Sequence, residues 1–208
     1  MKTSHLAYKT ILAFLLLVLL GLGLYGHTFQ APFTFDDAPN ILQNPHIRLT
    51  SITPAKILQI QNSPSPRPLA NFTFAVNYYF HQYQPAGYHV INLGIHIITA
   101  WLIFLLVRSS LGIWRIQQPL IPLAAACLWL VHPLHTQSVT YIVQRMNSLA
   151  TFFYVLALLC YIKTRLIPAE EEKSTIKKGL LFSAVILSGL LGLATKPIVA
   201  MLPIMLLL

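Results

Sequence analysis

Long uninterrupted runs of apolar residues constrain this chain more than any other feature of its sequence. Three of these runs are Ile11–Tyr25, Val90–Val107 and Leu180–Ala194. A bilayer core about 30 Å thick is crossed by about 20 mostly apolar residues in a helix. The run Val90–Val107 nearly meets that length alone, and the others meet it once flanking aromatic and snorkelling side chains such as Tyr8 are counted. We therefore expect an all-α integral membrane protein.

The spacing of the apolar segments predicts a polytopic helical bundle of about five to six spans, forming a single transmembrane domain over residues 1–208. The expected spans are residues 9–27, 89–107, 118–135, 146–162, 179–195 and 197–208. Because the last segment stops inside an apolar run, we expect the chain to be a fragment of a longer protein.

Basic residues at the ends of the apolar segments predict one orientation. Under the positive-inside rule, Lys2 and Lys9 place the N-terminus in the cytoplasm. Arg108 and Arg115 after the second span, and the cytoplasmic loop at about 163–178, agree with this alternation. No small-x-small cleavage site follows the first span, so we expect a retained signal-anchor helix rather than a cleaved signal peptide.

With this topology, residues 27–88 form a large outer loop that contains short helices. A threonine N-cap followed by Pro54 predicts a helix over Thr53–Gln61. Apolar, mainly aromatic residues at helical spacing predict a second helix over Leu69–Tyr83, lying along the membrane interface. The alternative is a buried helix of a small outer domain. Asn71–Thr73 also forms an N-glycosylation sequon on this side.

Composition excludes two other classes of protein. The net charge of +9 does not indicate nucleic-acid binding, because the basic residues flank apolar segments instead of forming a stripe interleaved with exposed aromatics. Cys127 and Cys160 both fall inside apolar segments, so no disulfide framework is expected.

Asp36 and Asp37 are the only acids outside the 170–172 run. They follow the outer end of the first span. Adjacent carboxylates at a membrane surface can act as a general base, or can hold a divalent cation or a hydroxyl-bearing substrate. The alternative is a structural turn or helix cap, which aspartate also favours.

Three cations are expected on the same outer side as the aspartates: Arg67, Arg145 and Lys196. Together they could hold an anionic group such as phosphate, with arginine acting as a bidentate fork. The alternative is anchoring at the interface by snorkelling.

The histidines do not form a zinc signature. His132 and His135 are interrupted by a proline, whereas His89 and His96 share one helix face with Asn92. Because zinc requires three or four closely spaced ligands, we expect no metal site here, and we interpret these side chains as hydrogen-bonded packing residues.

Taken in order, these motifs resemble the start of the transmembrane-and-tetratricopeptide-repeat O-mannosyltransferases and their bacterial relatives, which are polytopic GT-C glycosyltransferases. The resemblance covers about residues 30 to 200. It rests on Phe35-Asp36-Asp37, Asn44-Pro45, Arg67-Pro68-Leu69, Asn77-Tyr78, Gly87-Tyr88-His89-x-x-Asn92-x-x-x-His96, His132-Pro133-x-x-Thr136 and Tyr141-Ile142-Val143-Gln144-Arg145.

The resemblance implies transfer of a sugar, such as mannose, from a polyprenyl-phosphate-linked donor to a hydroxyl of a protein or glycan acceptor at the outer side of the lipid bilayer. Asp36 or Asp37 would deprotonate the acceptor hydroxyl, which attacks the anomeric carbon with inversion. A divalent cation could sit at this pair. The leaving lipid phosphate would be stabilised by cations. The residues implied are Arg145, Lys196 and Arg67 for the phosphate, with His89, Asn92, His96 and His132 in support.

Two departures from the family pattern stand out. The family has many more spans and often a C-terminal repeat array. In the family, an acid often follows the lysine that corresponds to Lys196, whereas Pro197 follows it here. The alternatives are therefore a transporter or flippase subunit and an inactive truncated membrane fragment. Charged groups at the outer ends of spans argue against a transporter. The short loops and the lack of a sorting signal favour a bacterial inner membrane over the endoplasmic reticulum.

Overall fold

The computed structural model describes residues 2–63, 65–116, 118–168 and 174–207, with side chains from Tyr8 onward. Every regular element in these ranges is helical, which confirms the expected all-α class. The α-helices are α1 (Lys2–Tyr25), α2 (Pro54–Gln61), α3 (Pro68–His81), α4 (Pro85–Ile113), α5 (Leu120–Val131), α6 (Thr136–Thr140), α7 (Arg145–Leu166), α8 (Ser174–Leu193) and α9 (Leu202–Leu207). The short 3-10 or π turns are η1 (Gly26–Gln30), η2 (Ala38–Leu42), η3 (Pro45–Ile47), η4 (Pro133–His135), η5 (Ile142–Gln144) and η6 (Pro197–Met201).

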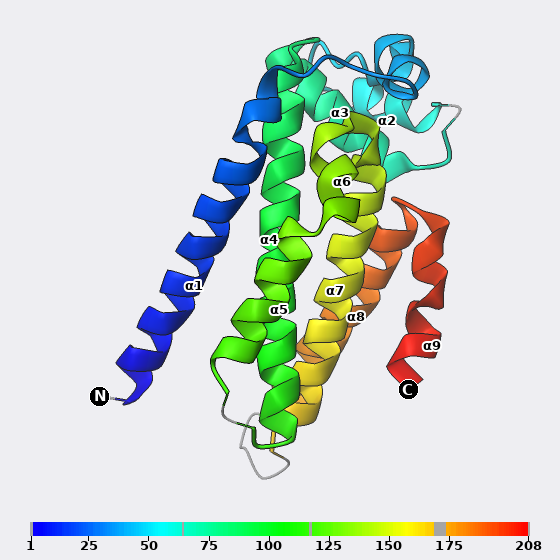
Figure 1. Cartoon of the computed structure of the whole chain (residues 1–208). Helices are drawn as coiled ribbons and strands as arrows, with labels where there is room; N and C mark the ends of the chain where they lie inside the picture. The colour runs from blue at the N-terminus through cyan, green and yellow to red at the C-terminus, as the bar shows by residue number, and fades with distance from the viewer. Residues whose placement is uncertain (1, 64, 117, 169–173, 208) are drawn as a thin grey trace.

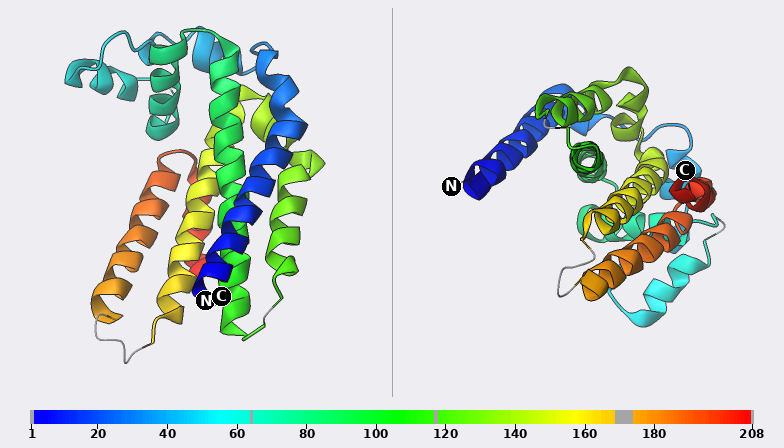
Figure 2. Two further views of the ribbon diagram at one scale, coloured as in Figure 1. Left: turned by 90° about the vertical axis from the view of Figure 1, so that its left-hand side faces the viewer. Right: turned by 90° about the horizontal axis from the view of Figure 1, so that it is seen from below.

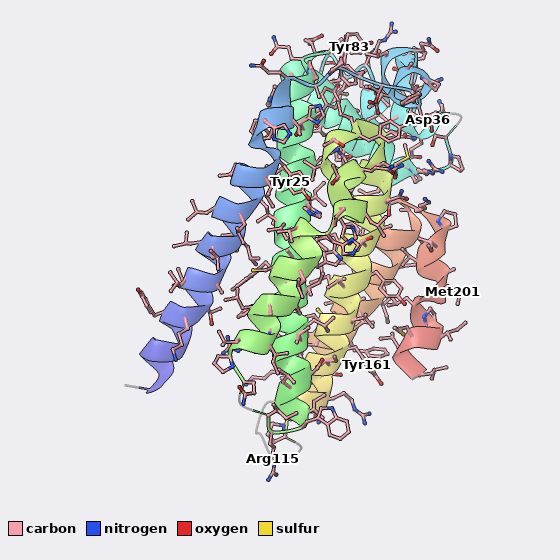
Figure 3. The ribbon with its side chains drawn as sticks, in the orientation of Figure 1. Tyr25, Asp36, Tyr83, Arg115, Tyr161 and Met201 are labelled. Atoms are coloured by element: carbon pink, nitrogen blue, oxygen red, sulfur yellow. The ribbon has the colours of Figure 1, made fainter. Side chains whose placement is uncertain are left out.

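The long helices run side by side with alternating direction (Figure 1, Figure 2). Four segments are long and apolar enough to cross a membrane: Tyr8–Gln30, Pro85–Ile113, Ile142–Leu166 and Ser174–Leu193. We call the end of the bundle that carries residues 26–84 the loop end. The other end, where α4 finishes and Arg115 lies, is called the basic end (Figure 3).

Two of the six expected spans are shorter than predicted. The expected span 118–135 is the helix α5, whose 12 residues cover about 18 Å, well short of a 30 Å core. It ends at Val131 because Pro133 has no N–H and disfavours a helical His132. The chain then reaches the loop end through η4, α6 and η5. The last expected span is likewise a short apolar stretch, Pro197–Leu207, built from η6 and α9.

The outer loop contains both predicted helices, and it also has a core of its own. The Thr53 hydroxyl accepts a hydrogen bond from the Lys56 N–H (3.4 Å) and caps α2. One face of α3 is buried in a cluster that joins the loop to α4 and η5. Its members are Ile41, Ile47, Leu49, Ile60, Ala70, Phe74, Ala75, Tyr88, Ile142, Val143 and Met146. The other face of α3 exposes aromatic residues, including Phe80 at 68%. The helix therefore combines the two alternatives, with a buried face in a small core and an exposed aromatic face suited to a membrane interface.

The sequon at Asn71 lies inside α3 and is closed to modification in this fold. Asn71 is 1% exposed, and its amide donates a hydrogen bond to the Ser65 carbonyl (3.1 Å). Glycosylation needs an accessible acceptor on a surface loop.

Helix α1 packs closely against α4 at a small residue, Gly21. A Cβ atom added at Gly21 would lie 2.7 Å from Cγ1 of Ile97, and the Tyr25 hydroxyl donates a hydrogen bond to the Leu130 carbonyl (3.0 Å) on α5. Close approach at small residues is the usual means of packing helices in membranes, where no hydrophobic force draws them together.

We expect Gly21→Leu to separate α1 from α4 and to lower the thermal stability of the detergent-solubilised chain by about 1–3 kcal/mol, the usual cost of overpacking. Gly23→Leu is the matched control, because a Cβ atom at Gly23 meets nothing within 4 Å. Thermal unfolding of both variants tests the contact, and equal melting temperatures would contradict it.

Candidate functional site

The segment that carries the two aspartates is fixed to the start of α7 by Asp37. This side chain is 1% exposed. Its Oδ1 accepts a hydrogen bond from the Val143 N–H (2.7 Å) and its Oδ2 accepts one from the Thr34 N–H (2.9 Å). Both carboxylate oxygens therefore hold the loop against η5. For Asp37 this agrees with the alternative considered above, in which an aspartate of this pair stabilises a turn.

Burial raises the pKa of Asp37 above its ordinary value, while the Thr34 and Val143 N–H donors and the nearby His89 partly offset this effect. Desolvation disfavours the charged form of a carboxyl, and hydrogen bonds to the carboxylate favour it. The result is a buried acid whose position is set by the backbone around it.

Asp36, in contrast, points to the surface of the loop end (Figure 3). Its N–H donates to the Tyr141 hydroxyl (2.9 Å), and its carbonyl accepts from the side-chain amide of Asn40 (2.8 Å). The preceding residue, Phe35, is 85% exposed and has a positive φ of 41°. Such a backbone is strained for a bulky residue and is often found at functional sites. The backbone of Asp36 is therefore held while its carboxylate stays accessible.

Arg145 lies inside the bundle at the N-terminus of α7 and is 0% exposed. Its Nε donates to Oδ1 of Asn92 (2.7 Å), and its terminal nitrogens donate to the carbonyls of Tyr88 (3.0 Å) and Thr73 (3.3 Å). The guanidinium carbon also lies 4.7 Å from the centre of the Phe74 ring. The side chain thus links α3, α4 and α7. This buried position differs from the surface position expected of a phosphate ligand.

Asn92 and His89 complete the buried network around Arg145 and Asp37. The Asn92 amide donates to the Ile142 carbonyl (3.1 Å). The two ring nitrogens of His89 lie 3.1 Å from the Val139 carbonyl oxygen and 3.0 Å from that of Ala31. These contacts attach α4 to the loop, to η5 and to α6.

Arg67 and Lys196 lie around the first turn of α7 and are half-buried. The Arg67 guanidinium contacts the Met146 sulfur, and the Lys196 ammonium donates to the side-chain carbonyl of Asn147. Asn147 in turn donates to Gln144. The Leu69 N–H donates to the Ala194 carbonyl (3.1 Å), which holds the start of α3 against the end of α8.

The structure thus gathers two cationic and two amide side chains near the positive end of the α7 dipole. Gln144 was named only within the motif that ends at Arg145, and neither Gln144 nor Asn147 was predicted to be a site residue. The sequence feature that could have identified them is their position beside Arg145, in the segment where the chain re-enters the membrane.

His96 and His132 lie apart from the aspartates. His96 contacts Tyr25 and Trp129 between α1, α4 and α5, with ring centres 5.6 and 4.6 Å away. His132 is exposed and its Nδ1 accepts from the Leu134 N–H (3.3 Å). Within the described ranges, no group of three or more His, Cys, Asp or Glu side chains is placed to hold a metal ion.

We expect Arg145→Gln to lower stability by about 3 kcal/mol or more, because it leaves buried acceptors on Asn92, Tyr88 and Thr73 without a donor. Thermal unfolding in detergent measures the loss. The control is Arg165→Gln on the same helix, where the side chain is exposed and no loss is expected. Equal stability of the two variants would disprove the structural role of Arg145.

The raised pKa of Asp37 also predicts that the stability of the fold depends on pH. A carboxyl whose pKa is raised by folding stabilises the fold below its unfolded pKa, near 3.8, and that contribution is lost as the pH rises through the folded value. Acidification from pH 7 to pH 4 should therefore raise the melting temperature of the unmodified chain relative to Asp37→Asn. Melting curves of both at several pH values test this, and a relative fall on acidification would give the opposite sign.

Comparison with known proteins finds relatives along most of the chain. It is 31% identical over 161 residues, 72% of its length, to "Protein O-mannosyl-transferase F38B6.6" of Caenorhabditis elegans. It is 33% identical over 153 residues, 66% of its length, to "Protein O-mannosyl-transferase Tmtc1" of Drosophila melanogaster. It is 30% identical over 155 residues, 69% of its length, to "Protein O-mannosyl-transferase TMTC2" of Homo sapiens.

These matches cover only 23%, 16% and 18% of the three relatives' own lengths. All three relatives are animal proteins, so they give no support to the expectation of a bacterial inner membrane. No family model matches the chain, and no solved structure matches it.

Proposed function

Because this chain is homologous to the protein O-mannosyl-transferases over about 70% of its length, we propose that it forms part of a membrane glycosyltransferase. The enzyme transfers a sugar, mannose in the first instance, from a polyprenyl-phosphate donor to a hydroxyl of a protein or glycan. The observation that carries this proposal is the exposed Asp36 carboxylate, which is presented by a backbone that Asp37 and Tyr141 hold in place.

Asp36 is the general base in this proposal. Its carboxylate takes the proton of the acceptor hydroxyl as the oxygen attacks the anomeric carbon from the face opposite the phosphate. The bond between the anomeric carbon and the phosphate oxygen breaks, and the electron pair leaves with the lipid phosphate. General bases contribute about 10²–10⁴-fold to such reactions. Asp37 acts as a positioning residue, since it is buried and both of its oxygens accept backbone hydrogen bonds.

Arg67 and Lys196 are the proposed ligands of the donor phosphate. Both are half-buried cations on flexible side chains, and the helix α7 begins between them with its amide groups and its positive dipole end. Arg145 stays buried beneath this surface and supports it through Asn92 and the α3 and α4 carbonyls, without contacting the donor.

A divalent cation fits this donor set poorly. Magnesium and calcium take several oxygen ligands, yet the oxygens of Asp37 already accept two N–H groups, which leaves the Asp36 carboxylate as the accessible one of the pair. The proposed reaction therefore has no step that passes through a metal ion.

The proposed orientation follows from the charges. Lys9, Arg108, Arg115, Lys163 and Arg165 lie toward the basic end, which the positive-inside rule assigns to the cytoplasm. The loop end, with Asp36, then faces the outer side of the membrane.

The test compares Asp36→Asn with Asp37→Asn in sugar transfer from polyprenyl-phosphate mannose and in thermal stability. Asp36→Asn should lower transfer at least about 100-fold with an unchanged melting temperature. Asp37→Asn should lower both. Gln61→Ala, an exposed change in the same loop, is the control and should alter neither. Normal transfer by Asp36→Asn would refute the assignment, and a lack of transfer by the unmodified chain would favour the inactive-fragment alternative.

A further inference from the structure

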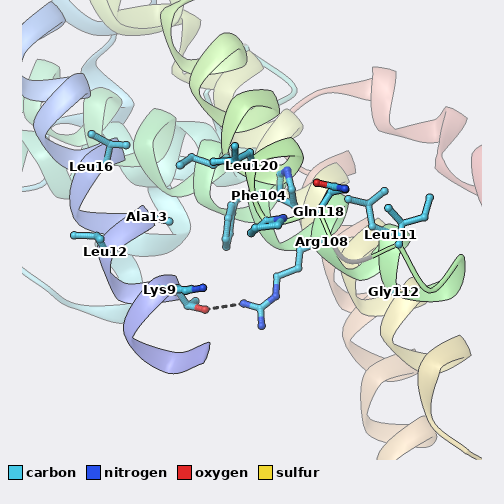
Figure 4. A pocket seen from close by; sticks show the side chains of 15 residues that line it. Lys9, Leu12, Ala13, Leu16, Phe104, Arg108, Leu111, Gly112, Gln118 and Leu120 are labelled. Atoms are coloured by element: carbon cyan, nitrogen blue, oxygen red, sulfur yellow. Dashed lines mark hydrogen bonds between the residues drawn. The ribbon is translucent and has the colours of Figure 1, made fainter. Parts of the chain in front are cut away.

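A pocket lies at the basic end, between the lower half of α1 and the facing parts of α4 and α5 (Figure 4). Its volume is about 810 Å³, within the usual range for a ligand pocket. It exists because α1 is held against α4 near Gly21 and leans away from it toward the N-terminus (Figure 1). Lys9 precedes Tyr25 by 16 residues, or about 24 Å along a helix, so this pocket is far from Asp36.

The walls of the pocket are apolar and open toward the lipid side. They are formed mainly by Leu12, Leu16, Phe104, Leu111, Leu120 and Leu123. Leu12 is 53% exposed and Leu120 is 72% exposed, so hydrocarbon rather than water would surround these side chains in a membrane.

The charged side chains in the lining are both cations, Lys9 and Arg108. Lys9 is exposed. Arg108 is half-buried and donates to the Thr10 hydroxyl (2.6 Å) across the gap between α4 and α1. None of the lining residues that the structure describes is acidic. A pocket with hydrocarbon walls and two cations at its rim is complementary to one kind of molecule, an amphiphile with an anionic head group.

We propose that this pocket binds an anionic phospholipid, with its phosphate at Lys9 and Arg108 and an acyl chain along the apolar wall between α1, α4 and α5. Bound there, the lipid would fill the space that the tilt of α1 leaves. It would also join α1 to the rest of the bundle at the end where the two helices diverge (Figure 1).

The experiment measures the stabilisation of the detergent-solubilised chain by phosphatidylglycerol and by phosphatidylcholine, together with the number of lipids retained in native mass spectrometry. Phosphatidylglycerol should raise the melting temperature more and should be retained preferentially. The double variant Lys9→Gln, Arg108→Gln should lower its affinity about fivefold for each cation removed. Arg115→Gln is the matched control, because Arg115 is exposed at the same end but does not line the pocket.

Two further variants separate the head group from the acyl chain and from folding. Gly112 lines the pocket and an added Cβ there meets nothing within 4 Å. Gly112→Trp should therefore block the acyl chain and reduce lipid retention while keeping both cations. Thr10→Val removes the hydrogen bond to Arg108 and keeps the charge, so lipid retention should persist.

Equal binding of the two lipids, or retention of phosphatidylglycerol unaffected by both the double variant and Gly112→Trp, would overturn the proposal. Inorganic phosphate at the same concentration should not stabilise the chain. Stabilisation by phosphate equal to that by phosphatidylglycerol would show a simple anion site and would also overturn it.

Discussion

The architecture of the loop end depends on one buried guanidinium group. Arg145 has no exposed surface, and it donates to Asn92 on α4 and to the carbonyls of Tyr88 and Thr73. A charge placed inside a protein is tolerated only when its hydrogen bonds are satisfied. The two helices that supply the acceptors, α3 and α4, must therefore keep one arrangement with α7, which supplies the guanidinium group. This arrangement determines where α7 begins and where the outer loop can lie.

The two adjacent aspartates have different surroundings because of this arrangement. Asp37 accepts the N–H of Val143, two residues before Arg145, and is thereby drawn into the interior. Its neighbour must then face outward, since the backbone at Phe35 turns with a positive φ and Asp36 is tied to Tyr141. As a result, one carboxylate of the pair is accessible, on a backbone held by hydrogen bonds to Tyr141 and Asn40.

The two ends of the bundle have different chemistry for a related reason. At the loop end, short helices, prolines and a buried polar network hold the chain close to the long helices. At the basic end, α1 has few such attachments, and its separation from α4 leaves an apolar pocket with cations at the rim. Polar contacts hold the proposed reaction surface in place, whereas a membrane lipid is proposed to occupy the pocket at the opposite end.

The sequence by itself determined the all-α membrane class, the positions of the four long helices, α2 and α3, and the set of charged residues from which a site could be built. These follow from apolar length, helical spacing and proline position, all of which are local. It did not separate Asp36 from Asp37, it placed Arg145 among the phosphate ligands, and it assigned no role to Gln144 or Asn147. It also predicted a full span where α5 stops at Val131. Only the tertiary structure decided these points, because burial and hydrogen bonds depend on residues that are far apart in the chain, such as Asp37 and Val143. A local sequence pattern does not show which of two neighbouring carboxylates the fold will bury.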